Sequence, residues 1–165
     1  MLTASGSALS GLVGASPISL NEFVARNNNG PVDENNQHED WLELYNSSNQ
    51  PVNVSGMYVT DNLQIGPKWQ IPTGNTIPAG GTMLIWCDED GNQGPLHANF
   101  KLSANGEELG LFAADGRTLV DSFTFGPQQA DISNGRMFDG ATPWVSFAQP
   151  TDRKRNELPG CGARA

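Results

Sequence analysis

Basic residues are scarce in this chain of 165 residues. Nine lysines and arginines stand against eighteen acidic residues, and the formal net charge is -9. Because such a charge repels phosphate backbones, nucleic acid is disfavoured as a partner. One basic run, RKR, occupies residues 153–155. A run of this kind near a terminus is typical of a solvated tail, and the alternative is a local binding stripe.

Cysteine and histidine are also rare. The two cysteines, Cys87 and Cys161, are too few for a disulfide framework or a four-ligand zinc site. They leave two alternatives, a single disulfide formed in an oxidising compartment or a Cys87 that is simply buried. His38 and His97 lie in expected loops, and they provide neither a two-histidine metal face nor a nucleophile with its base and orienting acid. Because GxSxG, HExxH and glycine-rich phosphate motifs are also lacking, we predict no enzymatic activity.

Long apolar runs are missing as well. No stretch approaches the roughly 18 apolar residues that a membrane-spanning helix needs, so no membrane span is expected. Residues 1–17 are small and weakly hydrophobic, which indicates a linker or a processed N-terminus. Composition turns polar after residue 150. We therefore expect a domain over residues 18–150 and a polar C-terminal tail over residues 151–165.

Short segments of alternating polarity fill the predicted domain. The first clear one is EDWLELYN at residues 39–46, which turn-forming residues follow at once. Similar segments recur to residue 147, with Gly, Pro, Asn-Gly and Asp-Gly between them. The nearly continuous apolar run TMLIWC at residues 82–87 predicts a central strand covered on both faces. Eight to ten short strands predict an all-β sandwich or barrel.

The two faces of the strand at residues 39–46 differ in character. Leu42 and Leu44 share one face, which we assign to the core because alternate side chains of a strand point the same way. Trp41, Glu43 and Tyr45 share the other face. An open aromatic face of this kind binds protein partners or stacks on sugar rings. The alternative is that another sheet, or the polar loop at residues 26–38, covers it.

The ordered segments resemble the lamin tail domain. The matching pieces are ISLNEF at 18–23, DWLELYN at 40–46, SGMYVTD at 55–61, KWQIP at 68–72, IPAGGTMLIW at 77–86, LHANFKLSANGEELGLF at 96–112 and SNGRMFDG at 133–140. This resemblance implies an immunoglobulin-like β-sandwich that acts as a non-enzymatic interaction module. The polar loop at residues 26–38 and the LHANFKLS segment are more similar to the bacterial members, which implies an extracellular or cell-surface location.

Two charged residues are expected to have structural roles. If residues 18–25 alternate regularly, Glu22 shares a face with Ile18, Leu20 and Val24. Arg136 likewise lies beside apolar residues inside a family-like segment. Because an unpaired buried charge is costly, we hypothesise that Glu22 and Arg136 pair, directly or through backbone groups. The alternative is that both lie at strand ends in water.

Acidic residues near the polar loop suggest a calcium site. Carboxylates and the Asn amides of residues 27–36 supply the oxygen ligands that Ca²⁺ prefers. The candidate ligands are Asp33, Glu34, Glu39, Asp40 and Asp61. The spacing fits no EF-hand, and the alternative is that these side chains are only solvated. The acidic turn at residues 88–90 has the same two interpretations.

The sequence thus predicts an interaction or surface-attachment module of a larger secreted or cell-surface bacterial protein, with a protein as partner. The alternative is a carbohydrate-binding module that uses Trp41, Tyr45 and Glu43, with loops ordered by calcium.

Overall fold

A computed structural model describes residues 15–156, which form twelve strands and no helix. No helix that could cross a membrane is therefore found in that range. The strands are β1 (Ile18–Val24), β2 (Asp40–Asn46), β3 (Val52–Asn53), β4 (Tyr58–Thr60), β5 (Trp69–Gln70), β6 (Thr76–Ile77), β7 (Thr82–Cys87), β8 (His97–Ala98), β9 (Glu107–Phe112), β10 (Leu119–Phe125), β11 (Ser133–Arg136) and β12 (Trp144–Phe147).

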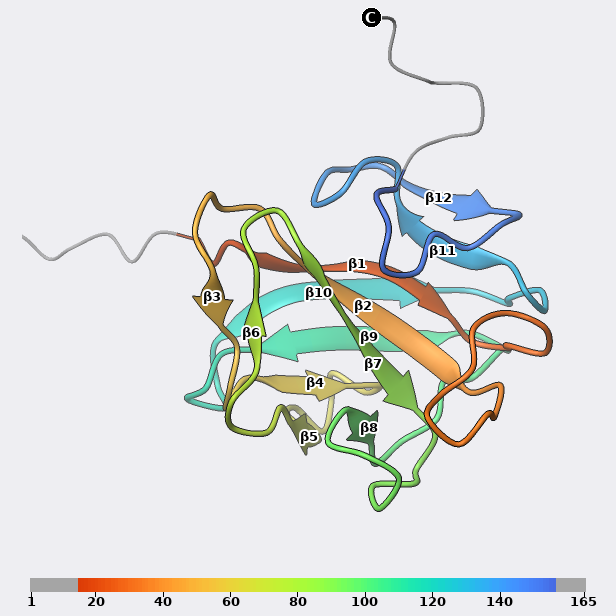
Figure 1. Cartoon of the computed structure of the whole chain (residues 1–165), viewed down its shortest axis with the longest axis horizontal. Helices are drawn as coiled ribbons and strands as arrows, with labels where there is room; N and C mark the ends of the chain where they lie inside the picture. The colour runs from red at the N-terminus through yellow and green to blue at the C-terminus, as the bar shows by residue number, and fades with distance from the viewer. Residues whose placement is uncertain (1–14, 157–165) are drawn as a thin grey trace, which may run out of the picture.

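Two larger sheets lie face to face (Figure 1). One has six strands in the order β12-β11-β1-β2-β7-β8, the other has four in the order β10-β9-β4-β5, and β3 pairs with β6 separately. The β7–β8 pair is parallel and the remaining strand pairs are antiparallel. The predicted all-β, immunoglobulin-like sandwich is confirmed.

The core lies between the two sheets. Leu42 and Leu44 of β2 are 1% and 0% exposed and pack with Leu111 of the opposite sheet, so their assignment to the core is confirmed. In β7, Ile85 belongs to this core whereas Trp86 belongs to a second cluster. The run at residues 82–87 is apolar because both faces of β7 are covered at its buried end.

Strand β1 does not alternate regularly. Its register with β2 shifts between Leu20 and Glu22, where Asn21 is the extra residue. A bulge of this kind adds one residue to one strand and reverses the faces that follow. Ile18 and Leu20 therefore point into the core, but Glu22 lies opposite Glu43 and away from it. The expectation that Glu22 shares a face with Ile18 and Leu20 is wrong for this reason.

Cys87 is fully buried, and burial raises the pKa of its thiol well above the ordinary value. The alternative of a disulfide involves Cys161, which lies outside the described residues.

Candidate functional site

The outer face of the six-stranded sheet, where ligand binding was expected, is largely covered. Trp41 and Glu43 are both 0% exposed, and Tyr45 is partly exposed. The chain after β12 crosses back over β1 (Figure 1) and contributes the covering residues. The expectation of an open stripe is therefore wrong for Trp41 and Glu43, because Trp41 is buried in a cluster with Val24, Leu84 and Trp86, and Glu43 is buried beneath the backbone of Arg153.

Residues 151–156, expected to be part of a polar tail, bind this outer face. Trp41 packs with Trp86 in the second apolar cluster, and the Arg153 guanidinium lies 5.9 Å from the centroid of the Trp86 ring. This distance suits a cation–π contact. The backbone N–H of Arg153 also donates to Glu43 Oε2 at 2.7 Å. The covering segment is therefore held by both stacking and hydrogen bonding.

Two carboxylates are buried beneath the covering segment. Glu22 and Glu43 are register partners on β1 and β2 and are 1% and 0% exposed. Burial raises the pKa of Glu43 to about 7. The hydrogen bonds from Asn21 and Arg153 act in the opposite direction and lower this pKa, whereas the charge of Glu22 raises it. Burial also raises the pKa of Glu22, although the hydrogen bonds from Thr151 oppose this rise.

Arg136 does not form an ion pair with Glu22. Its NH2 group donates to Asp121 Oδ2 at 2.7 Å, and its Nε donates to the Leu20 carbonyl at 2.7 Å. Asp121 Oδ2 also accepts from the Leu20 N–H at 2.9 Å. The hypothesis of a Glu22–Arg136 ion pair is wrong because the bulge in β1 turns Glu22 to the outer face, where Thr151 donates to it, whereas Arg136 donates to Asp121 of the opposite sheet. Since Asp121 belongs to β10, Arg136 links the two sheets.

A surface of aromatic and basic side chains adjoins the covered face. Tyr45 of β2 and Phe138, which is 48% exposed, line a hollow of about 250 Å³ with Asp139, Arg155 and Asn156. A neighbouring hollow of about 230 Å³ shares Asp139 and Arg155, and its other lining residues are Gly80, Gly81, Thr82, Arg153 and Lys154. We call Tyr45, Phe138, Asp139, Arg153, Lys154 and Arg155 the basic–aromatic surface.

The residues proposed as calcium ligands are not gathered into one set. Asp61 forms an ion pair with Lys68 at 2.8 Å. Asp40 Oδ1 accepts from the Asn27 N–H at 3.3 Å, and burial raises the pKa of Asp40 to about 6. Burial also raises the pKa of Glu39. Asp33 alone among the five candidate ligands joins a close group of metal-ligand side chains within the described range.

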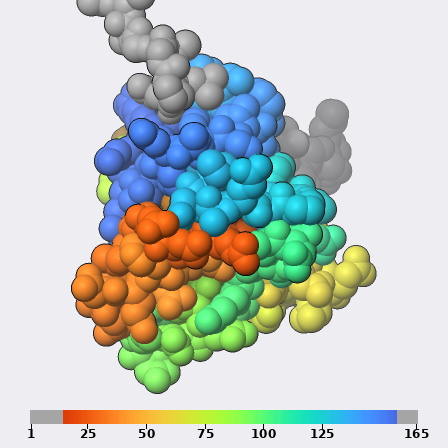
Figure 2. Space-filling view, turned by 90° about the vertical axis from the view of Figure 1, so that its right-hand side faces the viewer, coloured from red at the N-terminus to blue at the C-terminus, as the bar shows by residue number. Residues whose placement is uncertain are grey.

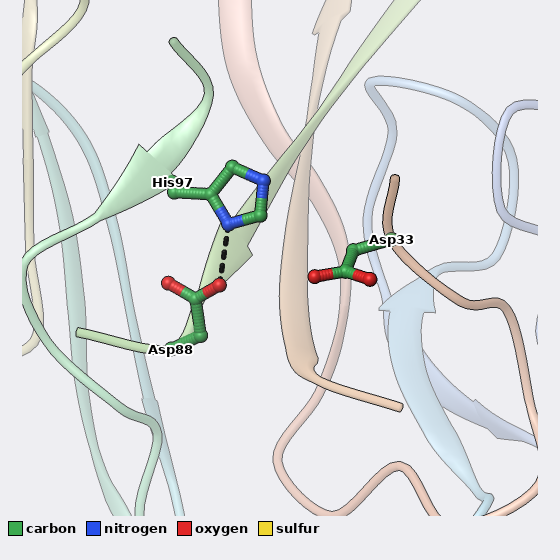
Figure 3. Close-up of side chains that lie close together, drawn as sticks. All are labelled: Asp33, Asp88 and His97. Carbon is green, nitrogen blue, oxygen red and sulfur yellow. Dashed lines mark hydrogen bonds and ion pairs between the residues drawn. The ribbon is translucent and has the colours of Figure 1, made fainter. Parts of the chain in front are cut away.

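That group is formed by Asp33, Asp88 and His97, whose ligand atoms all lie within 4.8 Å of one another (Figure 3). Their exposed fractions are 6%, 1% and 1%. His97 Nδ1 hydrogen-bonds to Asp88 Oδ2, and His97 Nε2 lies 3.1 Å from Glu34 Oε2. Burial lowers the pKa of His97, but the hydrogen bonds to Asp88 and Glu34 outweigh it and raise the pKa above its ordinary value.

The parallel β7–β8 pair brings this group together. Its register sets His97 opposite Trp86 and Ala98 opposite Cys87, so His97 lies beside the end of β7 where Asp88 follows. The polar loop at residues 26–38 adds Asp33, and this loop lies directly against the loop at residues 88–97 (Figure 2). The sequence pattern gave no signal for a two-residue parallel strand. The acidic turn at residues 88–90 and the nearby histidine were the available hints.

Comparison with known families gives one match over the described domain. The family model described as Lamin Tail Domain matches residues 14–127, which is more than half of the chain. Comparison with curated protein sequences gave no significant match.

Proposed function

Because the chain belongs to the lamin tail domain family, a family of immunoglobulin-like interaction modules, we propose that it serves as a protein-interaction or surface-attachment module of a larger secreted or cell-surface bacterial protein. The basic–aromatic surface is the observation that carries this proposal. It combines aromatic and arginine side chains, the residue types that contribute most to protein interfaces.

The charge of this surface defines the partner chemistry. Arg153, Lys154 and Arg155 are all exposed and gather on a chain whose net charge is -9. Such a local basic patch attracts acidic groups, and Phe138 offers apolar area beside it. We therefore propose a protein segment that carries acidic side chains next to an apolar one. The location of the parent protein outside the cytoplasm is supported by the resemblance to bacterial members.

Selection from a phage-displayed peptide library tests this proposal. We expect selected peptides to combine Asp or Glu with an apolar residue, and their binding to weaken with added salt. The double substitution Phe138→Ser and Arg155→Glu should weaken binding about tenfold or more. The matched control is Ile65→Ser with Lys101→Glu, because both residues are exposed and lie outside the basic–aromatic surface. Peptides that bind both double variants equally well would contradict the proposal.

Sugar binding is the second candidate function. The partial exposure of Tyr45 beside Phe138 favours it, because two aromatic rings at a hollow are suited to stacking on a sugar ring. A glycan array probed with the wild-type domain and with Tyr45→Ala separates the two functions. Glycan binding that Tyr45→Ala abolishes would support the second candidate over the first.

A further inference from the structure

We propose that Asp33, Asp88 and His97 bind a divalent transition-metal ion of the zinc type. These residues come from the polar loop, the end of β7 and β8, and their ligand atoms lie within 4.8 Å of one another. The site lies at the end of the sandwich where the loops at residues 26–38 and 88–97 meet (Figure 2). It is separate from the basic–aromatic surface, so the proposal stands apart from the proposed function.

The carboxylate of Asp33 provides an independent observation for a bound cation. Its Oδ1 accepts from the backbone N–H groups of Asn35 and Gln37, both at 2.8 Å, and these bonds fix the carboxylate. Its Oδ2 is buried and has no hydrogen-bond partner. Figure 3 shows one Asp33 oxygen directed toward the Asp88 carboxylate. A buried carboxylate oxygen without a donor is unfavourable unless a cation or a proton satisfies it.

The surroundings of His97 match those of a metal-ligating histidine. Such a histidine binds the ion through one ring nitrogen and gives its other N–H to a carboxylate or carbonyl. His97 Nδ1 faces Asp88, and His97 Nε2 lies 3.1 Å from Glu34 Oε2. Glu34 is therefore the outer partner that orients the ring. Asp88 is oriented in turn, because its Oδ1 accepts from the Asp90 N–H at 3.0 Å.

Gly94 leaves the space that the imidazole occupies. A Cβ atom at residue 94 would lie 2.9 Å from His97 Cδ2 and 3.2 Å from His97 Nε2. The first of these contacts is too close for any side chain. The chain thus holds the ring of His97 on two sides, by the glycine backbone and by Glu34.

The donor set selects the class of ion. Imidazole nitrogen with two carboxylates suits Zn²⁺, which is bound by His and by Asp or Glu at about 2.0–2.2 Å. Calcium takes six to eight oxygen ligands, and an imidazole is not among those it prefers. An ion at this position would tie the loop at residues 26–38 to the end of β7.

Calorimetric titration of the chelator-treated domain with ZnCl₂ tests the site. We expect one Zn²⁺ per chain, and Asp33→Asn should weaken binding about a hundredfold, since loss of an outer partner alone costs about 10–100-fold. The variant keeps an acceptor oxygen for Asn35 and Gln37, so its loops remain ordered. Asp90→Asn is the matched control, because it removes the same charge from an exposed residue of the neighbouring loop.

The nitrogen resonances of the two imidazoles provide a second readout. The chain has two histidines, His38 and His97. Zn²⁺ should shift the ring-nitrogen resonances of His97 and leave those of His38 unchanged. Absence of Zn²⁺ binding, equal binding by wild type and Asp33→Asn, or binding of Ca²⁺ in place of Zn²⁺ would overturn the proposal. So would a zinc-induced shift confined to His38.

Discussion

Ionisation of Glu43 should make the domain less stable as the pH rises. Glu43 is 0% exposed, and its pKa rises from an ordinary value of 4.5 to about 7 in the folded protein. Between these two pH values the folded state holds a proton that the unfolded state has lost. The free energy of unfolding therefore falls with increasing pH across this window. Since one pKa unit corresponds to about 1.4 kcal/mol, the loss attributable to Glu43 is about 3 kcal/mol.

Substitution of Glu43 by Gln isolates this contribution. Glu43 accepts hydrogen bonds from Asn21 Nδ2 at 3.0 Å and from the Arg153 N–H at 2.7 Å. Gln keeps one acceptor oxygen, so the variant loses one of these bonds, about 1 kcal/mol at every pH. We expect Glu43→Gln to be less stable than wild type at pH 4.5 and more stable by about 2 kcal/mol at pH 8.

Urea unfolding followed by tryptophan fluorescence from pH 4.5 to pH 8 measures this difference. Glu89→Gln is the matched control, since Glu89 is exposed, and its pH dependence should follow that of wild type. Raised carboxylates that are not coupled to Glu43, such as Asp40 at about 6, contribute equally to all three proteins and cancel in the comparison. If wild type and Glu43→Gln lose the same stability between pH 4.5 and pH 8, Glu43 does not take up a proton in the folded state and the reasoning fails.

Two further predictions concern how distant segments hold the sandwich together. Arg136→Met should lower the free energy of unfolding by about 3 kcal/mol, because it removes the charged donor of the Asp121 carboxylate and the side-chain donor of the Leu20 carbonyl. Adding Asp121→Asn should recover part of this loss, and additive effects of the two substitutions in thermal unfolding would refute the link. Ending the chain after Pro150 removes the segment that covers the outer cluster. The truncated domain should therefore melt at least several degrees lower and bind a hydrophobic dye. An unchanged melting temperature would instead support the domain boundary predicted at residue 150.

The all-β fold could be predicted because the polarity pattern that identifies each strand lies within a few consecutive residues. Alternation in β2 and the apolar run of β7 each reflect how a strand is covered, and both correctly indicated buried faces. The bulge at Asn21 left no such signal, since one polar residue fits either phase of a strand. The partner of Arg136 was missed for the same reason, because the bulge turns Glu22 to the outer face while Arg136 donates to Asp121 of the opposite sheet.

The candidate sites were harder to predict because they depend on contacts between distant residues. Residues 151–156 are polar and lack periodicity, and they bind the sheet mainly through hydrogen bonds, which leave no hydrophobic pattern. Asp33 was correctly noted as a candidate metal ligand, but its neighbours Asp88 and His97 lie 55 and 64 residues further along the chain. The parallel pairing of β7 with β8 brings His97 to Asp88, and the position of the loop at residues 26–38 brings Asp33 to both.

The extra residue in β1 divides that strand into two parts with opposite tolerance to substitution. Before Asn21, the even-numbered residues face the core and need apolar side chains. After Asn21, the odd-numbered Phe23 faces the core, and the even-numbered Glu22 lies on the outer face of the sheet. Deletion of Asn21 would keep Glu22 opposite Glu43 and Phe23 opposite Leu42, whereas regular pairing that includes Asn21 would turn Phe23 outward and drive Glu22 into the interior. An alignment with a strand that lacks this bulge therefore needs its gap at Asn21, because a gap elsewhere in residues 18–24 would misassign the orientation of the side chains between that gap and Asn21.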